Sequence, residues 1–279
     1  MRLQPLFAAL ALACTAAACA HPSATTADPS PADAAPQVLL LGEVHDNAQG
    51  HAQRAAMLRE RVEAGWRPVL AMEQFDTGQQ AALDAAMRSC TDADCVVKQA
   101  APGKSSWTWA HYAPVIELAL QHKLNVVAAN LSRADASKVI KGGFEAALPA
   151  EVIARYQLDA LPAPLLAAQA TEVRDGHCGM LPAAMEEPMA KAQIARDVVM
   201  AETMRPHAAN GVVLIAGNGH VRKDVGVPVW LRKAGLSPRA EGFVEGKADA
   251  EAFDVVHAIP AVTGRGDPCA AFKAPKPAG

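Results

Sequence analysis

Short runs of consecutive apolar residues recur along the chain, and each run stops at a glycine or a polar residue. The first is Val-Leu-Leu-Leu at 38–41, which ends at Gly42. Uninterrupted aliphatic runs of this length are typical of strands buried on both faces of a parallel sheet. Similar runs lie at 69–72, at 124–129, where Asn125 is the one polar residue, and at 212–216. Because segments with helical apolar spacing separate them, the pattern predicts an α/β fold with a mostly parallel central sheet and helices on both faces.

Three stretches depart from this simple alternation. Residues 149–206 are mostly helical sequence punctuated by prolines, so they predict a helical insertion whose longest helix covers 188–204. Residues 90–109 have no regular pattern and are a candidate lid. A run at 254–259 predicts a last strand at an edge of the sheet. An edge strand can be antiparallel to its neighbour in a mostly parallel sheet, so that orientation is one alternative.

The length and charge of the chain narrow the possible partners. The 279 residues carry a formal net charge of -3 without a block of like charges, which argues against a nucleic-acid partner. We expect a single α/β domain over 37–269. Residues 20–36 are rich in Ala, Pro, Ser and Thr and predict a disordered tether, and residues 270–279 predict a flexible tail.

The first residues have the features of an export signal. Arg2 precedes an apolar segment at 6–13, and three alanines stand directly before Cys19. This cysteine resembles that of a lipobox, so residues 1–19 predict a signal peptide with Cys19 as the lipidated membrane anchor. An ordinary cleaved signal, or lipidation at Cys14, is the alternative. By resemblance to lipoprotein sorting preferences, Ala20 favours the outer membrane, with the protein facing the periplasm.

Four further cysteines suit a compartment that permits disulfides. Cys90 and Cys95 flank a turn-like stretch and predict a local bridge, which leaves Cys178 to pair with Cys269. The alternative is that Cys178 is a free thiol or a ligand. There is no CxxC pair, so the sequence does not indicate a structural zinc site.

Carboxylate and imidazole side chains follow the predicted strands. Glu43 and His45 come directly after the first strand, and their spacing in extended chain places them on the same side. Glu73 ends the second strand, and His220 follows residues 212–216 with the same Gly-x-x-His spacing that places His45. Because the carboxyl ends of parallel strands share one edge of a sheet, we expect the four side chains to meet there.

Two imidazoles and two carboxylates suit a divalent transition metal such as Mn, Fe, Co or Zn. A bound metal would supply a hydroxide nucleophile, which predicts a metal-dependent hydrolase. Without a metal, the same groups suit general acid and base chemistry. The structural alternative is that the histidines satisfy loop backbone groups and the glutamates cap helices.

Three motifs together resemble a known family. They are Leu-Gly-Glu-Val-His-Asp-Asn at 41–47, Ala-Met-Glu-Gln at 71–74 and Ala-Gly-Asn-Gly-His at 216–220. The chain is similar in these motifs to the ChaN-type haem-binding uptake lipoproteins of the ChaN/Tiki superfamily. The resemblance implies an exported, membrane-tethered α/β protein that takes part in haem or iron uptake and binds haem between two subunits, as a homodimer.

The same superfamily leaves a second function open. Its Tiki branch uses two Gly-x-x-His motifs and a glutamate as a metal-dependent peptidase site. By this resemblance, residues 42–45, residues 217–220 and Glu73 stand at the matching positions here. A peptidase-like or esterase-like hydrolase is therefore the alternative to a haem-binding protein, and the sequence leaves open whether the protein is an enzyme.

A haem-binding protein needs an axial ligand, an apolar surface and cations for the propionates. Tyr112 is one candidate ligand, because it belongs to the aromatic segment Trp-Thr-Trp-Ala-His-Tyr at 107–112. His177, beside Cys178, is the other. Methionines along 185–204 are an alternative apolar wall, although stripes of this kind are mostly core.

Overall fold

The computed structural model describes residues 37–247, 249, 251–267 and 269–270. The predicted signal peptide, Cys19, the 20–36 tether and all of the tail except its first residue lie outside this part of the chain. No helix in the described part is both long enough and apolar enough to cross a membrane.

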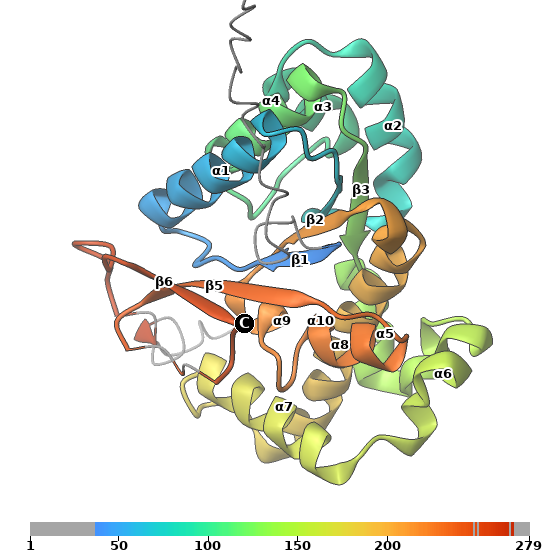
Figure 1. The fold of residues 1–279 in the computed structure, drawn as a ribbon. Helices are drawn as coiled ribbons and strands as arrows, with labels where there is room; N and C mark the ends of the chain where they lie inside the picture. Colours follow the sequence, from blue (N-terminus) through green and yellow to red (C-terminus); the bar gives the residue numbers. More distant parts are fainter. Residues whose placement is uncertain (1–36, 248, 250, 268, 271–279) are drawn as a thin grey trace, which may run out of the picture. The chain divides into compact units, whose positions relative to one another are not determined.

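The described residues form one six-stranded sheet in the order β3-β2-β4-β1-β5-β6, and every neighbouring pair is parallel (Figure 1). The α/β fold predicted from the aliphatic runs is therefore confirmed. The central strand β1 pairs with β4 on one side and β5 on the other. The strands are β1 (Val38–Leu41), β2 (Val69–Asp76), β3 (Val126–Asn130), β4 (Val212–Ile215), β5 (Arg239–Glu245) and β6 (Val255–Ile259).

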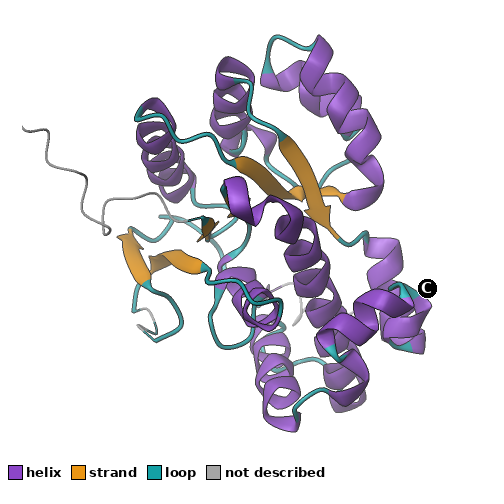
Figure 2. Ribbon diagram, turned by 45° about the vertical axis from the view of Figure 1, so that its right-hand side comes forward, coloured by secondary structure: helices purple, strands orange, loops and turns teal. Residues whose placement is uncertain are grey.

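Helices cover both faces of this sheet (Figure 2). One layer contains α1 to α4 and the other contains the helices that follow β3, with α5, α6, α8 and α10 packed on the sheet. The first layer consists of α1 (Ala48–Glu63), α2 (Gln80–Ser89), α3 (Ala93–Ala100) and α4 (Ala113–His122). The later helices are α5 (Arg133–Gly142), α6 (Ala150–Tyr156), α7 (Ala163–Gly176), α8 (Ala183–Met204), α9 (Asn218–Val221) and α10 (Val227–Lys233).

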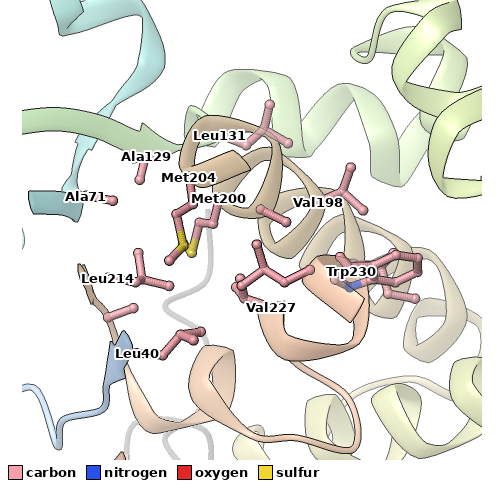
Figure 3. Close-up of a cluster of buried hydrophobic side chains, with 14 of the residues drawn as sticks. Leu40, Ala71, Ala129, Leu131, Val198, Met200, Met204, Leu214, Val227 and Trp230 are labelled. Atoms are coloured by element: carbon pink, nitrogen blue, oxygen red, sulfur yellow. The ribbon is translucent and has the colours of Figure 1, made fainter. Parts of the chain in front are cut away.

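The alternation of side chains along β1 explains why the strand has no polar residue. Leu39 and Leu41 join the hydrophobic core on the α1–α4 face, whereas Val38 and Leu40 join the core on the opposite face. In that second core, α8 and α10 contribute Met200, Met204 and Trp230, which are fully buried (Figure 3). These two methionines of the predicted apolar stripe are therefore core residues.

The edge formed by β5 and β6 differs from the prediction. The sequence of β5 carries charged residues and a glycine, so it lacks the apolar run that marks the other strands. The last strand is parallel rather than antiparallel. The reason is that Asp254 lies beside Ala240, to which it is joined by two 2.8 Å hydrogen bonds, so β6 begins at the same end of the sheet as β5.

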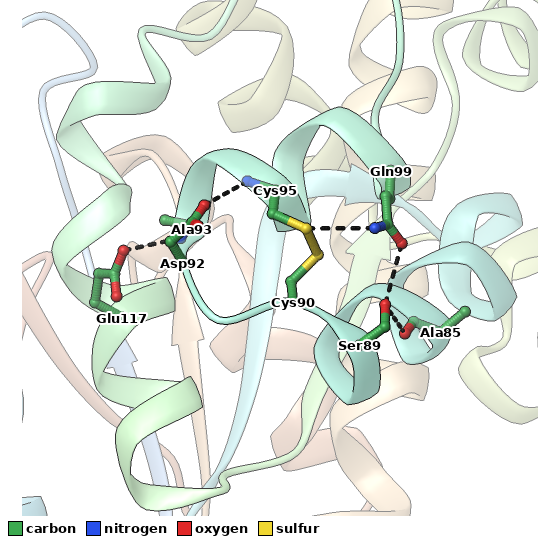
Figure 4. Close-up of a disulfide and its surroundings, with 8 residues drawn as sticks. All are labelled: Ala85, Ser89, Cys90, Asp92, Ala93, Cys95, Gln99 and Glu117. Carbon is green, nitrogen blue, oxygen red and sulfur yellow. Dashed lines mark hydrogen bonds between the residues drawn. A yellow bond between two sulfur atoms is a disulfide. The ribbon is translucent and has the colours of Figure 1, made fainter.

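Both predicted disulfides are present, between Cys90 and Cys95 and between Cys178 and Cys269. The first one joins the end of α2 to α3, inside the stretch predicted to be irregular (Figure 4). The α3 helix forms there because Asp92 caps it, accepting a hydrogen bond from the Cys95 amide at 2.8 Å. Residues 90–109 therefore contain a regular helix, which corrects the prediction.

Candidate functional site

Two close backbone approaches bring the Gly-x-x-His segments together at the carboxyl ends of β1 and β4. These strands are neighbours, so the segments leave the sheet side by side. A Cβ atom on Gly42 would overlap Asn218 Oδ1, and one on Gly217 would lie 2.9 Å from His45 Cε1. A larger residue at either position would therefore force the side chain of Asn218 or His45 to shift. The glycines of the two motifs therefore allow the loop after each strand to pack against the other.

A buried charge network holds His45. Its Nδ1 lies 2.8 Å from Oε1 of Glu43, and Tyr112 donates its hydroxyl to the same oxygen at 2.5 Å. The other oxygen of Glu43 accepts from Arg54, which is fully buried. Burial alone would raise the pKa of Glu43, but the Arg54 charge and the hydrogen bonds from His45 and Tyr112 outweigh it and hold the pKa well below its usual range. Glu43 is thus an ionised carboxylate that orients His45.

His220 has acidic neighbours on both ring nitrogens. Its Nδ1 lies 2.6 Å from Oδ1 of Asp197 on α8, and its Nε2 lies 3.5 Å from Oε1 of Glu73. The second oxygen of Glu73 accepts a 2.8 Å hydrogen bond from the Gly217 amide. Burial opposes protonation of this imidazole, but the charges of Asp197 and Glu73 prevail and raise the pKa of His220 to about 9. His220 is therefore an imidazolium at neutral pH.

Three of the four predicted site residues line one cavity of about 670 Å³, as expected from the strand ends. These are His45, Glu73 and His220, whereas Glu43 is buried behind His45. The cavity also has two indoles, three cationic side chains and several amides and hydroxyls in its wall. These further residues include Trp107, Trp109, Lys104, Arg133, Arg196, Gln74, Gln193 and Asn130.

The metal site expected at Glu43, His45, Glu73 and His220 stays a prediction. Within the described residues, no group of three or more histidine, cysteine or acidic side chains is placed to hold a metal ion. In the structure, Arg54, Tyr112 and His45 contact the two oxygens of Glu43, and the ring of His220 lies between the carboxylates of Asp197 and Glu73.

Neither predicted haem ligand lies in the wall of this cavity. Tyr112 has no exposed surface and donates its hydroxyl to Glu43, and burial together with that carboxylate raises its pKa well above the usual range. Because a ligating tyrosine must reach the iron and lose its proton, the structure argues against Tyr112. His177 lies at the C-terminal end of α7, with Nδ1 2.7 Å from the Val173 carbonyl oxygen.

The sequence did not indicate Arg54 and Asp197 as site residues, although both are buried and contact the site histidines or their carboxylates. Arg54 has 0% and Asp197 1% of its surface exposed. Each lies on the buried side of its helix. Arg54 lies between the buried residues Gly50 and Leu58 of α1, and Asp197 lies between the buried residues Ile194 and Val198 of α8. A charge on a buried helical face is the signal that would have found them, because such a charge requires a partner.

The residues present fit a haem group. Because Nδ1 of His45 is held by Glu43, Nε2 is the nitrogen left to ligate iron, in the arrangement common for metal-binding histidines. The side chain is 52% exposed, and the ring of Trp107 lies edge-on to it at 5.1 Å between centroids. Trp107 and Trp109 supply apolar surface, and the cationic side chains suit the propionates.

The fold and site define an α/β protein in which paired Gly-x-x-His loops border one polar cavity. The chain belongs to the family described as haem-binding uptake, Tiki superfamily, ChaN, whose model matches residues 32–231. No curated protein sequence matches it significantly.

Among solved structures, the chain shares its fold with the protein titled "Cofacial heme binding to ChaN of Campylobacter jejuni". The TM-score is 0.66 at 21% identity, over 79% of this chain and 86% of that one. A mutant of the erythromycin esterase EreC matches with a TM-score of 0.40 and 14% identity, over 75% of this chain and 70% of the other. A Bacillus cereus protein matches with a TM-score of 0.42 and 11% identity, over 75% and 65%. The last two similarities are too weak to support a functional argument.

Proposed function

We propose that this protein binds haem in the cavity at the carboxyl edge of its sheet and takes part in haem or iron uptake. The observation that carries the proposal is membership of the ChaN haem-binding family over residues 32–231. The cavity supports it, because an oriented imidazole, two indoles and three cations surround one space of about 670 Å³.

His45 is the iron ligand that the geometry favours. It combines an accessible ring with a carboxylate on Nδ1, and such a carboxylate fixes the tautomer and raises the basicity of the ligating nitrogen. His177, the other candidate from the sequence, lies outside the lining of this cavity, with Nδ1 2.7 Å from the Val173 carbonyl oxygen.

The assembly and the location belong to the same proposal. By analogy with the cofacial haem binding named for ChaN of Campylobacter jejuni, we propose that two copies of this chain associate around haem. We further propose that lipid on Cys19 anchors the protein in the outer membrane, facing the periplasm. Loss of fatty-acid labelling and release from the membrane in Cys19→Ser would support the anchor, and unchanged labelling would contradict it.

Titration of the purified protein with hemin tests the function directly. We expect a shifted Soret band that saturates, together with an increase in mass in analytical ultracentrifugation. His177→Ala should leave the spectrum unchanged if His45 is the ligand. Tyr112→Phe should still bind hemin, because the buried hydroxyl donates to Glu43 and is not the iron ligand. Absence of any Soret shift at micromolar protein would overturn haem binding. Tightly bound Mn, Co or Zn together with amide or ester hydrolysis would favour the hydrolase instead.

A further inference from the structure

One wall of the cavity contains a buried amide that lacks a protein partner. Gln74 directly follows Glu73 in β2, and only 4% of its surface is exposed. Neither its amide nitrogen nor its amide oxygen has a hydrogen-bond partner among the described residues, and the side chain lines the cavity. A buried polar group without a partner is costly, so such groups are rare unless a ligand or water completes them.

Two arginines from the α5–α8 side of the sheet line the same cavity. Arg196 on α8 donates from Nη1 to Asn130 Oδ1 at 2.6 Å and to the Leu131 carbonyl oxygen at 2.8 Å, which fixes its guanidinium. Arg133 is the first residue of α5 and is exposed. Within the described residues, neither arginine has a carboxylate within the 4.0 Å of an ion pair, in contrast to the buried Arg54.

The acidic side chains of the cavity are engaged elsewhere or lie farther away. Glu73 accepts from the Gly217 amide and contacts His220. Asp76 also lines the cavity, and the charge of Arg196 acts on it from beyond ion-pair distance, partly offsetting the rise of the Asp76 pKa that burial causes. A preorganised guanidinium, a second arginine and an amide donor therefore face a space that a carboxylate group would complete, because arginine binds carboxylates with paired, charge-assisted hydrogen bonds.

We propose that Gln74, Arg133 and Arg196 form a carboxylate-binding subsite in this cavity. The carboxylates come either from the propionates of haem or from a small free dicarboxylate. The first source rests on the proposed function, and these residues would then contact the edge of the porphyrin that carries the propionates. The second source is independent of haem.

The experiment compares hemin with hemin dimethyl ester, both delivered in the same nonionic detergent and followed at the Soret band. The wild-type protein should bind hemin about tenfold more tightly than the ester, because the ester lacks the two negative charges. Arg133→Gln, Arg196→Gln and Gln74→Leu should each weaken hemin binding about tenfold and change binding of the ester by less than about twofold. Arg59→Gln is the matched control, since Arg59 lies on α1 and pairs with Glu63.

Arg133 is exposed, so its variant tests the subsite even if Arg196→Gln proves unstable. A parallel arm measures the thermal midpoint with succinate in the absence of haem. If hemin and its ester bind alike but succinate stabilises the wild type and not the arginine variants, the subsite stands and its ligand is a free carboxylate. Equal binding of hemin and ester without a succinate effect would overturn the subsite, as would variants that weaken both porphyrins equally. A wild type that binds neither porphyrin contradicts the proposed function alone, and the succinate arm then decides the subsite.

Discussion

His45 and His220 follow neighbouring buried strands through the same Gly-x-x-His spacing, yet their surroundings differ. The His45 side chain is 52% exposed and has one carboxylate partner, Glu43, whose charge is balanced by Arg54. The His220 side chain is 15% exposed and lies between Asp197 and Glu73. The motif thus places an imidazole at the edge of the sheet, whereas side chains from other elements set the exposure and the charged partners of each imidazole.

The largest expected effect comes from removing the positive charge of Arg54, which pairs with Glu43 behind His45. Arg54→Met leaves Glu43 buried without its cation, so we expect the free energy of unfolding to fall by about 3–5 kcal/mol. Urea denaturation measures the loss, and Arg59→Met on the exposed side of the same helix is the control. A loss below about 1 kcal/mol would show that the buried pair of Arg54 and Glu43 contributes no more than an exposed ion pair does.

The raised pKa of His220 should make the free energy of unfolding depend on pH. The pKa of this histidine is about 9 in the folded protein and 6.5 in the unfolded chain. Its contribution is therefore fully present below pH 6.5 and is lost as the pH rises to 9, by up to about 3 kcal/mol. Thermal melts across this range should show a falling midpoint in the wild type. A flat profile would contradict the imidazolium assignment.

Asp197→Asn tests the cause of that shift. Removing the carboxylate 2.6 Å from Nδ1 should lower the pKa of His220 towards its ordinary value and reduce the free energy of unfolding by about 1–3 kcal/mol. Titration of the imidazole by NMR measures the change. The exposed Asp159→Asn serves as the control, and an unchanged His220 pKa in Asp197→Asn would mean that Glu73 alone supports the charge.

A smaller effect is expected at the loop that carries His45. Arg265 binds Asp46 with hydrogen bonds of 2.5 and 2.7 Å and also pairs with Glu245, and all of these contacts are exposed. We expect Arg265→Gln to shift the NMR signals of His45 while those of His220 stay in place, with little change in the thermal midpoint. Equal shifts of both histidines would indicate that a change in the loop after β1 also alters the loop after β4.

Much of this fold follows from residues that are close in sequence. The aliphatic runs of β1 to β4 are apolar because helices cover both faces, so the sheet and its functional edge are predictable. The strand β5 is not, because its buried Glu241 pairs with Arg61 and Arg239 and contacts His257, and Arg61 and His257 come from other elements. The same holds for the site. Nothing local to Tyr112 reveals that its hydroxyl is held by Glu43, 69 residues earlier.

Hemin titration of His45→Ala beside His220→Ala tests the central claim most directly. The account predicts that His45→Ala changes the Soret position and weakens hemin binding at least about tenfold, because the iron loses its ligand. His220→Ala should keep the wild-type Soret position, because an imidazolium does not ligate iron. The reverse result, a wild-type spectrum in His45→Ala and its loss in His220→Ala, would contradict the account.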